Sequence, residues 1–111
     1  MERALGSADT LHAPHLLDIE VTHALRRLVQ REAITPVRAA QGLDDLSQVF
    51  IERHAHQPLV ARIWQLRRSL TAYDGAYVAL AEALEAPLLT CDASMARAHG
   101  HQARVELIAE E

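Results

Sequence analysis

The sequence predicts one α/β domain over residues 1–111, with helices packed on a parallel sheet. A length of 111 residues suits one small domain, and 20 Ala and 16 Leu against 4 Gly and 4 Pro favour a helix-rich globule. The same composition argues against a disordered or an all-β chain. Residues 87–108 have the pattern of a strand, a helix and a second strand, and such a unit places its strands in parallel.

Short extended segments and an amphipathic helix are expected in the first part of the chain. Residues 1–6 have the pattern of a helix end that stops at Gly6, and residues 10–13 that of an extended piece ending at Pro14. Pro14 is expected in the first turn of a helix that runs to about Arg31. The apolar stripe of this helix is made by Leu17, Val21, Ala24, Leu25 and Leu28.

Further start signals follow in the middle of the chain. The Thr-Pro pair at 35–36 predicts a helix over about 36–47, and 49–52 is a brief strand candidate. A proline at position 58 opens another helix, which is expected to continue to residue 68.

The last third of the chain is expected to form the core. Residues 71–74 have the hydroxyl-x-x-acid spacing of a capping box, and residues 75–86 are apolar on nearly every side, as in a buried helix. A buried strand is expected at 87–91, a helix at 92–100 and a second strand at 105–108. Ligands of open parallel sheets bind beyond the carboxyl ends of such strands.

Charge and cysteine content limit the partners of the chain. The net charge is −4 and the pI about 5.9, so no basic surplus supports bulk binding of nucleic acid, and DNA binding by the chain alone is not expected. All 11 basic residues are Arg, which fits either phosphate pairing or the codon preference of a GC-rich genome. The single cysteine, Cys91, favours a reducing cytoplasm, and no apolar stretch has a membrane-spanning length.

Three acidic residues occupy positions with both a structural and a functional explanation. Glu20 borders the apolar stripe, where a carboxylate needs a partner, a metal ion or a path to water, whereas the nearby Asp18 is the more ordinary acid. Asp74 lies in the first turn of the core helix and Asp92 follows a buried strand, so capping alone could explain each. If Glu20, Asp74 and Asp92 converge, their repulsion favours a bound Mg²⁺ or Mn²⁺, which suits phosphodiester hydrolysis.

Other residue patterns give weaker signals. The His54-x-His56 and His99-x-His101 spacings could be zinc pairs, but no further Cys or His closes either pair at finger-like spacing. Tyr73 and Tyr77 are interpreted as core residues rather than as base-stacking residues. Since the sequence has no Gly-rich phosphate loop and no serine-hydrolase motif, kinases and serine hydrolases find no support.

Three runs of sequence resemble the PIN-domain ribonucleases of the VapC toxin type. They are APHLLDIEVTHALRRL at 13–28, LTAYDGAYVALAE at 70–82 and PLLTCDASMARA at 87–98. The resemblance implies a three-layer α/β/α sandwich and a Mg²⁺-dependent endoribonuclease that cleaves RNA, with Mn²⁺ as an alternative ion. It also implies neutralisation by a VapB-like antitoxin, and we expect a homodimer in the cytoplasm.

The resemblance also assigns roles to particular residues. It implies that Asp74 and Asp92 bind the metal ion, directly or through water, and that Glu20 binds it or activates a water molecule. Thr90 is then a supporting residue, with an ordinary strand threonine as the alternative, and Arg97 is a candidate phosphate contact.

The sequence departs from the family pattern at its N-terminus. Family members begin with a strand that ends in an aspartate, followed by a helix, and roughly 20 residues of that pattern are not found here. We therefore expect an N-terminally truncated PIN-like domain, with an apolar gap between the sheet halves that carry residues 10–13 and 105–108. The alternative function is a non-catalytic PIN remnant that binds an antitoxin or forms dimers.

Overall fold

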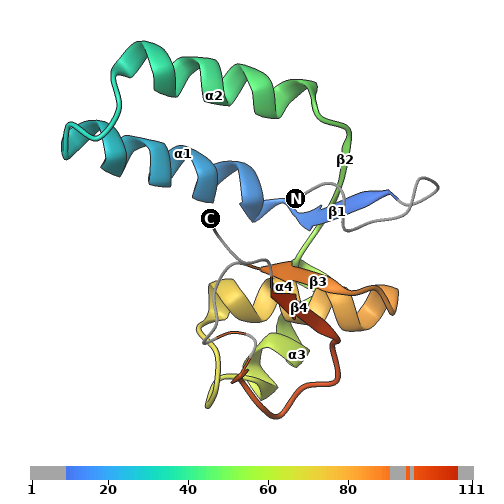
Figure 1. The fold of residues 1–111 in the computed structure, drawn as a ribbon. Helices are drawn as coiled ribbons and strands as arrows, with labels where there is room; N and C mark the ends of the chain where they lie inside the picture. The colour runs from blue at the N-terminus through green and yellow to red at the C-terminus, as the bar shows by residue number, and fades with distance from the viewer. Residues whose placement is uncertain (1–9, 91–94, 96, 108–111) are drawn as a thin grey trace.

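Figure 1 shows the fold in a computed structural model, which describes residues 10–90, 95 and 97–107. The expected helix end at residues 1–6 and the start of the expected helix at 92–100 lie outside the described residues. Within the described part of the chain, the elements are α-helices, one short 3₁₀ helix and parallel strands, so the predicted α/β class is confirmed.

The described strands form two separate parallel pairs. β1 (Leu11–Pro14) pairs with β2 (Ile51–His54), and β3 (Leu88–Thr90) pairs with β4 (Val105–Leu107). The parallel pairing of β3 and β4 is the one that the sequence predicted. No ladder joins the two pairs among the described residues. Within residues 10–90 and 97–107, the strands therefore form two separate pairs.

The strand β2 lies two residues later than predicted. The sequence predicts a strand at 49–52, but the preceding helix continues to Gln48 and Val49 is its C-cap. Phe50, with 77% of its surface exposed, lies between the helix and the strand. The apolar character of Val49 and Phe50 was therefore misleading, because neither residue enters the sheet.

The helices α1 (Leu16–Gln30) and α2 (Pro36–Gln48) lie side by side next to the β1–β2 pair (Figure 1). The Oγ1 of Thr35 accepts a hydrogen bond from the Arg38 backbone N–H at 3.0 Å, which confirms the predicted cap of α2. The prediction that Pro14 opens α1 is wrong. Strand pairing continues past Pro14, because the N–H of His15 donates to the carbonyl of His54 at 2.8 Å.

The segment predicted as one helix over 58–68 is divided in the structure. A 3₁₀ helix, η2 (Gln57–Leu59), is followed by α3 (Val60–Gln65), and the chain leaves helical geometry at Leu66. Leu66 is only 2% exposed and belongs to the apolar core with Leu70 and Val78. Burial of the two leucines therefore takes precedence over continuation of the helix.

The core forms around α4 (Ala72–Leu84), as the sequence predicted. Val78 is fully buried, and the partly buried side chains of Leu88 and Ala103 pack against the same core. Gly75 permits the close contact between α4 and α3, since a Cβ at this position would lie 3.2 Å from Cγ2 of Ile63. Tyr73, by contrast, is 63% exposed, so its interpretation as a core residue is wrong.

A charged pair fastens α3 to α4 at the edge of the core. Nε of Arg62 donates to Oε1 of Glu82 at 2.7 Å, and Nη2 of Arg62 donates to Oε2 at 2.9 Å. The backbone N–H of Gln102 donates to the same carboxylate at 2.7 Å. The hydrogen bonds from Arg62 hold the pKa of Glu82 below its ordinary value.

Among the described residues, no helix combines the length and the apolar character that a bilayer crossing requires.

We expect Glu82→Gln to lower the free energy of unfolding by about 1–3 kcal/mol at pH 7, because Arg62 loses its charged partner. Since the pKa of Glu82 is lowered by folding, its contribution is present above the unfolded glutamate pKa of about 4.3. That contribution is lost as the pH falls through the folded value. Urea unfolding of both proteins across this pH range measures the difference.

The matched control for this prediction is Glu106→Gln. The carboxylate of Glu106 faces the exposed Arg104 at 3.6 Å, and the effect should stay within about 0.5 kcal/mol. Equal losses in the two variants would contradict a special role for the pair of Arg62 and Glu82.

Candidate active site

A hydrogen bond between two distant helices forms the centre of the candidate site. The Tyr77 hydroxyl on α4 donates to Oε1 of Glu20 on α1 at 2.7 Å, across 57 positions of the sequence. Both residues are half-buried. The bond satisfies Glu20 at the edge of its apolar stripe, and it fixes the carboxylate relative to α4.

Asp74 lies one turn before Tyr77 on the same helix. Thr71 caps this helix, since its Oγ1 accepts a hydrogen bond from the Asp74 backbone N–H at 3.1 Å. The Thr71 part of the predicted capping box is therefore present. The cap explains why α4 begins at this point and why Asp74 lies in its first turn, where the helix dipole favours a carboxylate.

The electrostatics of Tyr77 connect these acidic residues. Burial raises the pKa of the phenol well above its ordinary value, and the hydrogen bond and charge of Glu20 raise it further. The charges of Asp74 and Asp18 act in the same direction. The phenol therefore lies in a negative field produced by α1 and α4, and it stays a hydrogen-bond donor.

Asp18 has a different role from its neighbours. The Arg53 guanidinium binds it with both arms, through Nε at 2.6 Å and Nη2 at 2.8 Å. These hydrogen bonds hold the pKa of Asp18 below its ordinary value. Because its charge is already paired with a residue of β2, Asp18 serves to attach α1 to the strands, in keeping with its interpretation as an ordinary acid.

The other predicted site residues are described to different extents. Thr90 is the last residue of β3 and is half-buried, and Arg97 is exposed. Asp92 lies outside the described residues. The structure thus joins Glu20 to Tyr77 by a hydrogen bond, and the charge of Asp74 acts on the same phenol. The convergence of Asp92 with these residues stays a prediction.

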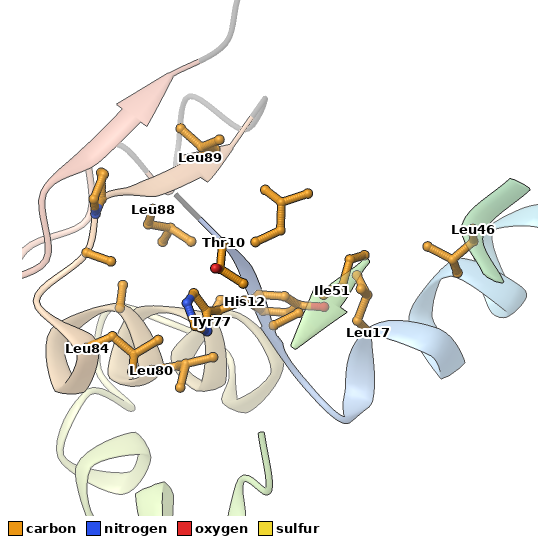
Figure 2. Close-up of a pocket in the computed structure, with 15 residues that line it drawn as sticks. Thr10, His12, Leu17, Leu46, Ile51, Tyr77, Leu80, Leu84, Leu88 and Leu89 are labelled. Atoms are coloured by element: carbon orange, nitrogen blue, oxygen red, sulfur yellow. The ribbon is translucent and has the colours of Figure 1, made fainter. Parts of the chain in front are cut away.

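An apolar cavity lies between the two strand pairs (Figure 2). Its volume is about 340 Å³, and aliphatic side chains of β1, α4 and β3, such as Leu80 and Leu88, form most of its wall. Tyr77 also lines it, whereas Glu20 and Asp74 do not. The cavity lies between the strand pairs that carry residues 11–14 and 105–107, and the described residues that line it include no Arg, Asp or Glu.

Comparison with known proteins identifies the family of the chain. The family model of the PIN domain matches residues 1–100. The chain belongs to the PIN domain family. It is 45% identical over 107 residues to Ribonuclease VapC1 of Mycobacterium tuberculosis, covering 96% of this chain and 80% of the relative.

Two further relatives carry VapC names. Identity to Ribonuclease VapC12 of Mycobacterium tuberculosis is 42% over 101 residues, covering 91% of this chain and 78% of the relative. Identity to VapC ribonuclease Mb0985 of Mycobacterium bovis is 42% over 90 residues, covering 81% and 71% of the two chains. The resemblance that the three sequence runs predicted is confirmed.

The residues of this PIN domain fit a hard divalent cation. Glu20 and Asp74 supply carboxylate oxygens, which Mg²⁺ and Mn²⁺ prefer, and their negative field around Tyr77 favours a nearby positive charge. The hydrogen bond of Tyr77 to Glu20 was not predicted from the sequence, where Tyr77 is interpreted as a core residue. Its position three residues after Asp74, on the same side of α4, was the available signal.

We expect the phenol of Tyr77 to remain protonated at a pH of about 10, where a free tyrosine is half ionised. Glu20→Gln should lower this pKa, because it removes a negative charge and the acceptor that prefers the neutral phenol. The titration is followed by the ultraviolet absorbance of phenolate. Subtracting the absorbance of Tyr77→Phe from that of the natural chain removes the contribution of Tyr73 and leaves that of Tyr77. The measurement covers the pH range in which circular dichroism shows folded protein.

Asp45→Asn, an exposed change on α2, is the control and should leave the Tyr77 titration unchanged. An unaltered titration in Glu20→Gln would argue against the bond between Glu20 and Tyr77.

Proposed function

We propose that this PIN-domain protein is a VapC-type toxin endoribonuclease that hydrolyses RNA phosphodiester bonds with Mg²⁺. The observation that carries the proposal is the hydrogen bond from the half-buried Tyr77 to Glu20, on a phenol that also feels the charge of Asp74. The PIN match of the chain covers residues 1–100. The VapC names of its relatives support ribonuclease activity.

The proposed mechanism assigns a task to each acidic residue. Glu20, Asp74 and Asp92 would hold the ion, and the Tyr77 hydroxyl keeps the Glu20 carboxylate in one orientation. A bound Mg²⁺ would supply a water of lowered pKa and would offset charge on the phosphoryl group. Thr90 supports the site from the end of β3, and exposed Arg97 contacts a substrate phosphate.

RNA approach in this proposal depends on local arginines, because the net charge of the chain is −4. Arg26 and Arg27 on α1, Arg67 and Arg68 after α3, and Arg97 are all exposed. A few local phosphate contacts suit a short single-stranded site better than a long duplex. The ribonuclease names of the relatives favour RNA over DNA, so we propose single-stranded RNA as the substrate.

Two protein partners complete the proposal. A VapB-like antitoxin neutralises the enzyme, as the family implies, and a second copy of the chain forms a homodimer. The exposed apolar side chains of Val60, Trp64 and Tyr73 support the dimer, since they line a surface hollow of about 430 Å³ on α3 and α4. The single Cys91 supports a cytoplasmic location.

We expect the natural chain to cleave single-stranded RNA when Mg²⁺ is present and to lose this activity in EDTA. Asp74→Asn and Asp92→Asn should each lower the rate by about 10²–10³-fold, the size expected for losing one preorganised charged group. Asp45→Asn should cleave at the natural rate. Fluorescent RNA oligonucleotides measure the rate, and single-stranded DNA of the same base sequence serves as a second substrate. Mn²⁺ replaces Mg²⁺ in parallel reactions.

The same assay separates the alternative, a non-catalytic module that binds an antitoxin or dimerises. The apolar cavity between the strand pairs is the observation that favours this alternative. Antitoxin binding without Mg²⁺-dependent cleavage by the natural chain would support it, and would contradict the nuclease proposal. Cleavage that survives both aspartate substitutions would exclude the proposed catalytic residues.

The dimer is tested separately by light scattering after size exclusion. We expect a dimeric mass for the natural chain and a monomeric mass for Trp64→Ser. The change removes the largest exposed apolar side chain of the surface hollow on α3 and α4. Phe50→Ser, at another exposed apolar site, should leave the mass unchanged. A monomer in the natural chain would contradict the dimer proposal.

A further inference from the structure

Three potential metal ligands gather on the β1–β2 pair. In the parallel register, His12 lies opposite Glu52, and Pro14 lies opposite His54. Alternate residues of a strand point to the same face, so Glu52 and His54 share one face of β2, and their register partners place His12 on the same face. The strand pairing alone thus brings two imidazoles and one carboxylate together.

The distances within this cluster are short. Nδ1 of His12 and Nε2 of His54 are 2.9 Å apart, and Nδ1 of His12 lies 3.8 Å from Oε1 of Glu52. The three ligand atoms all lie within 4.8 Å of one another. The two rings are tilted by 41°, with centroids 5.1 Å apart, so they are not stacked.

These distances are close to those of an occupied zinc site. With Zn–N distances of about 2.0–2.1 Å and tetrahedral angles, two ligand atoms lie roughly 3.3 Å apart. The observed separations of 2.9 and 3.8 Å lie on either side of this value, so small side-chain rotations would admit an ion. His12 and Glu52 are exposed, which leaves the cluster open to solvent.

The backbone beneath the cluster is held in place. β1 and β2 are paired from Leu11 and Ile51 up to Pro14 and His54, and the N–H of His15 donates to the carbonyl of His54 at 2.8 Å. Ligands carried by paired strands lose less conformational freedom on binding than ligands carried by loops. The backbone positions of His12 and His54 are therefore preorganised for binding an ion.

The donor set selects the class of metal ion. Two imidazole nitrogens and one carboxylate suit a transition-metal ion such as Zn²⁺, whereas Mg²⁺ prefers oxygen ligands and binds imidazole poorly. Neither Glu20 nor Asp74 belongs to this cluster. Its chemistry therefore differs from that of the proposed Mg²⁺ site.

We propose that His12, Glu52 and His54 form a binding site for Zn²⁺ or a similar divalent transition-metal ion. Three protein ligands leave one tetrahedral position for water or for a ligand from outside the chain. The spacings in the sequence suggested His54 with His56, and His99 with His101, as zinc ligands. In the described residues, neither pair forms the cluster. β2 ends at His54, so His56 lies beyond the strand pair, and Nδ1 of His101 accepts a hydrogen bond from Ala103.

The experiment is a Zn²⁺ titration of the full chain against a chromophoric chelator in metal-free buffer without Mg²⁺. We expect one equivalent of Zn²⁺ to bind, and His12→Ala and His54→Ala each to weaken its affinity by at least about tenfold. Glu52→Gln should weaken binding as well. Co²⁺ in place of Zn²⁺ should give visible absorption bands that are lost in the two histidine variants.

The controls are His15→Ala and His56→Ala, which remove exposed histidines next to the cluster in sequence and should bind Zn²⁺ as the natural chain does. Circular dichroism checks that each variant is folded, and His54→Gln replaces His54→Ala if the latter is not. Absence of Zn²⁺ binding by the natural chain would overturn the proposal, as would unchanged affinity in both His12 and His54 variants.

A last variant separates this site from the proposed nuclease site. Asp74→Asn should bind Zn²⁺ with unchanged affinity even though we expect it to lose RNA cleavage. Loss of Zn²⁺ affinity in Asp74→Asn, with natural affinity in His12→Ala, would assign the ion to the acidic residues and overturn the proposal. The nuclease proposal would stand in that case.

Discussion

Burial of α4 is the constraint on which the other elements depend. Six residues of this helix are buried, and Val78 is completely enclosed. A helix that is apolar on nearly all sides must be covered on several faces, because exposure of its surface costs free energy in proportion to the area left in water. α3, β1 and β3 all pack against it, and each contributes a different part of the cover.

The polar residues of α4 lie where this cover ends. Asp74 is in the first turn, Tyr77 reaches α1 through Glu20, and Glu82 reaches α3 through Arg62. Each hydrogen bond crosses from α4 to a different helix, so the polar contacts orient the elements that apolar packing brings together. Apolar packing has little directional preference, whereas hydrogen bonds fix distance and angle.

The described part of the molecule has three chemically distinct regions. The Glu20 carboxylate binds Tyr77 between α1 and α4, and aliphatic side chains line the cavity between the strand pairs. Two imidazoles lie together on the β1–β2 pair. Hard oxygen ligands, apolar surface and nitrogen ligands select different partners. The regions are close in space, and Tyr77 and His12 both border the cavity.

The sequence by itself determined the local features of this protein. Thr35 and Thr71 begin helices as predicted, residues 75–86 contain most of the core helix, and the segments around β3 and β4 pair in parallel. Such features depend on neighbours within a few positions, or on a short β-α-β unit whose connection permits one arrangement. The placement of Glu20 at the edge of an apolar stripe, and of Asp74 in a first helical turn, could be predicted for the same reason.

Only the tertiary structure decided which side chains meet. The partners in the bond between Tyr77 and Glu20 are 57 residues apart, and His12 and His54 are 42 apart. Spacing along the chain gives no information about such pairs, because strand register and helix packing set them. For that reason His54 was paired with His56 by sequence and with His12 by the fold. The exposure of Tyr73 and Trp64 was likewise hidden, since an aromatic side chain suits a core and a surface patch equally well until its neighbours are placed.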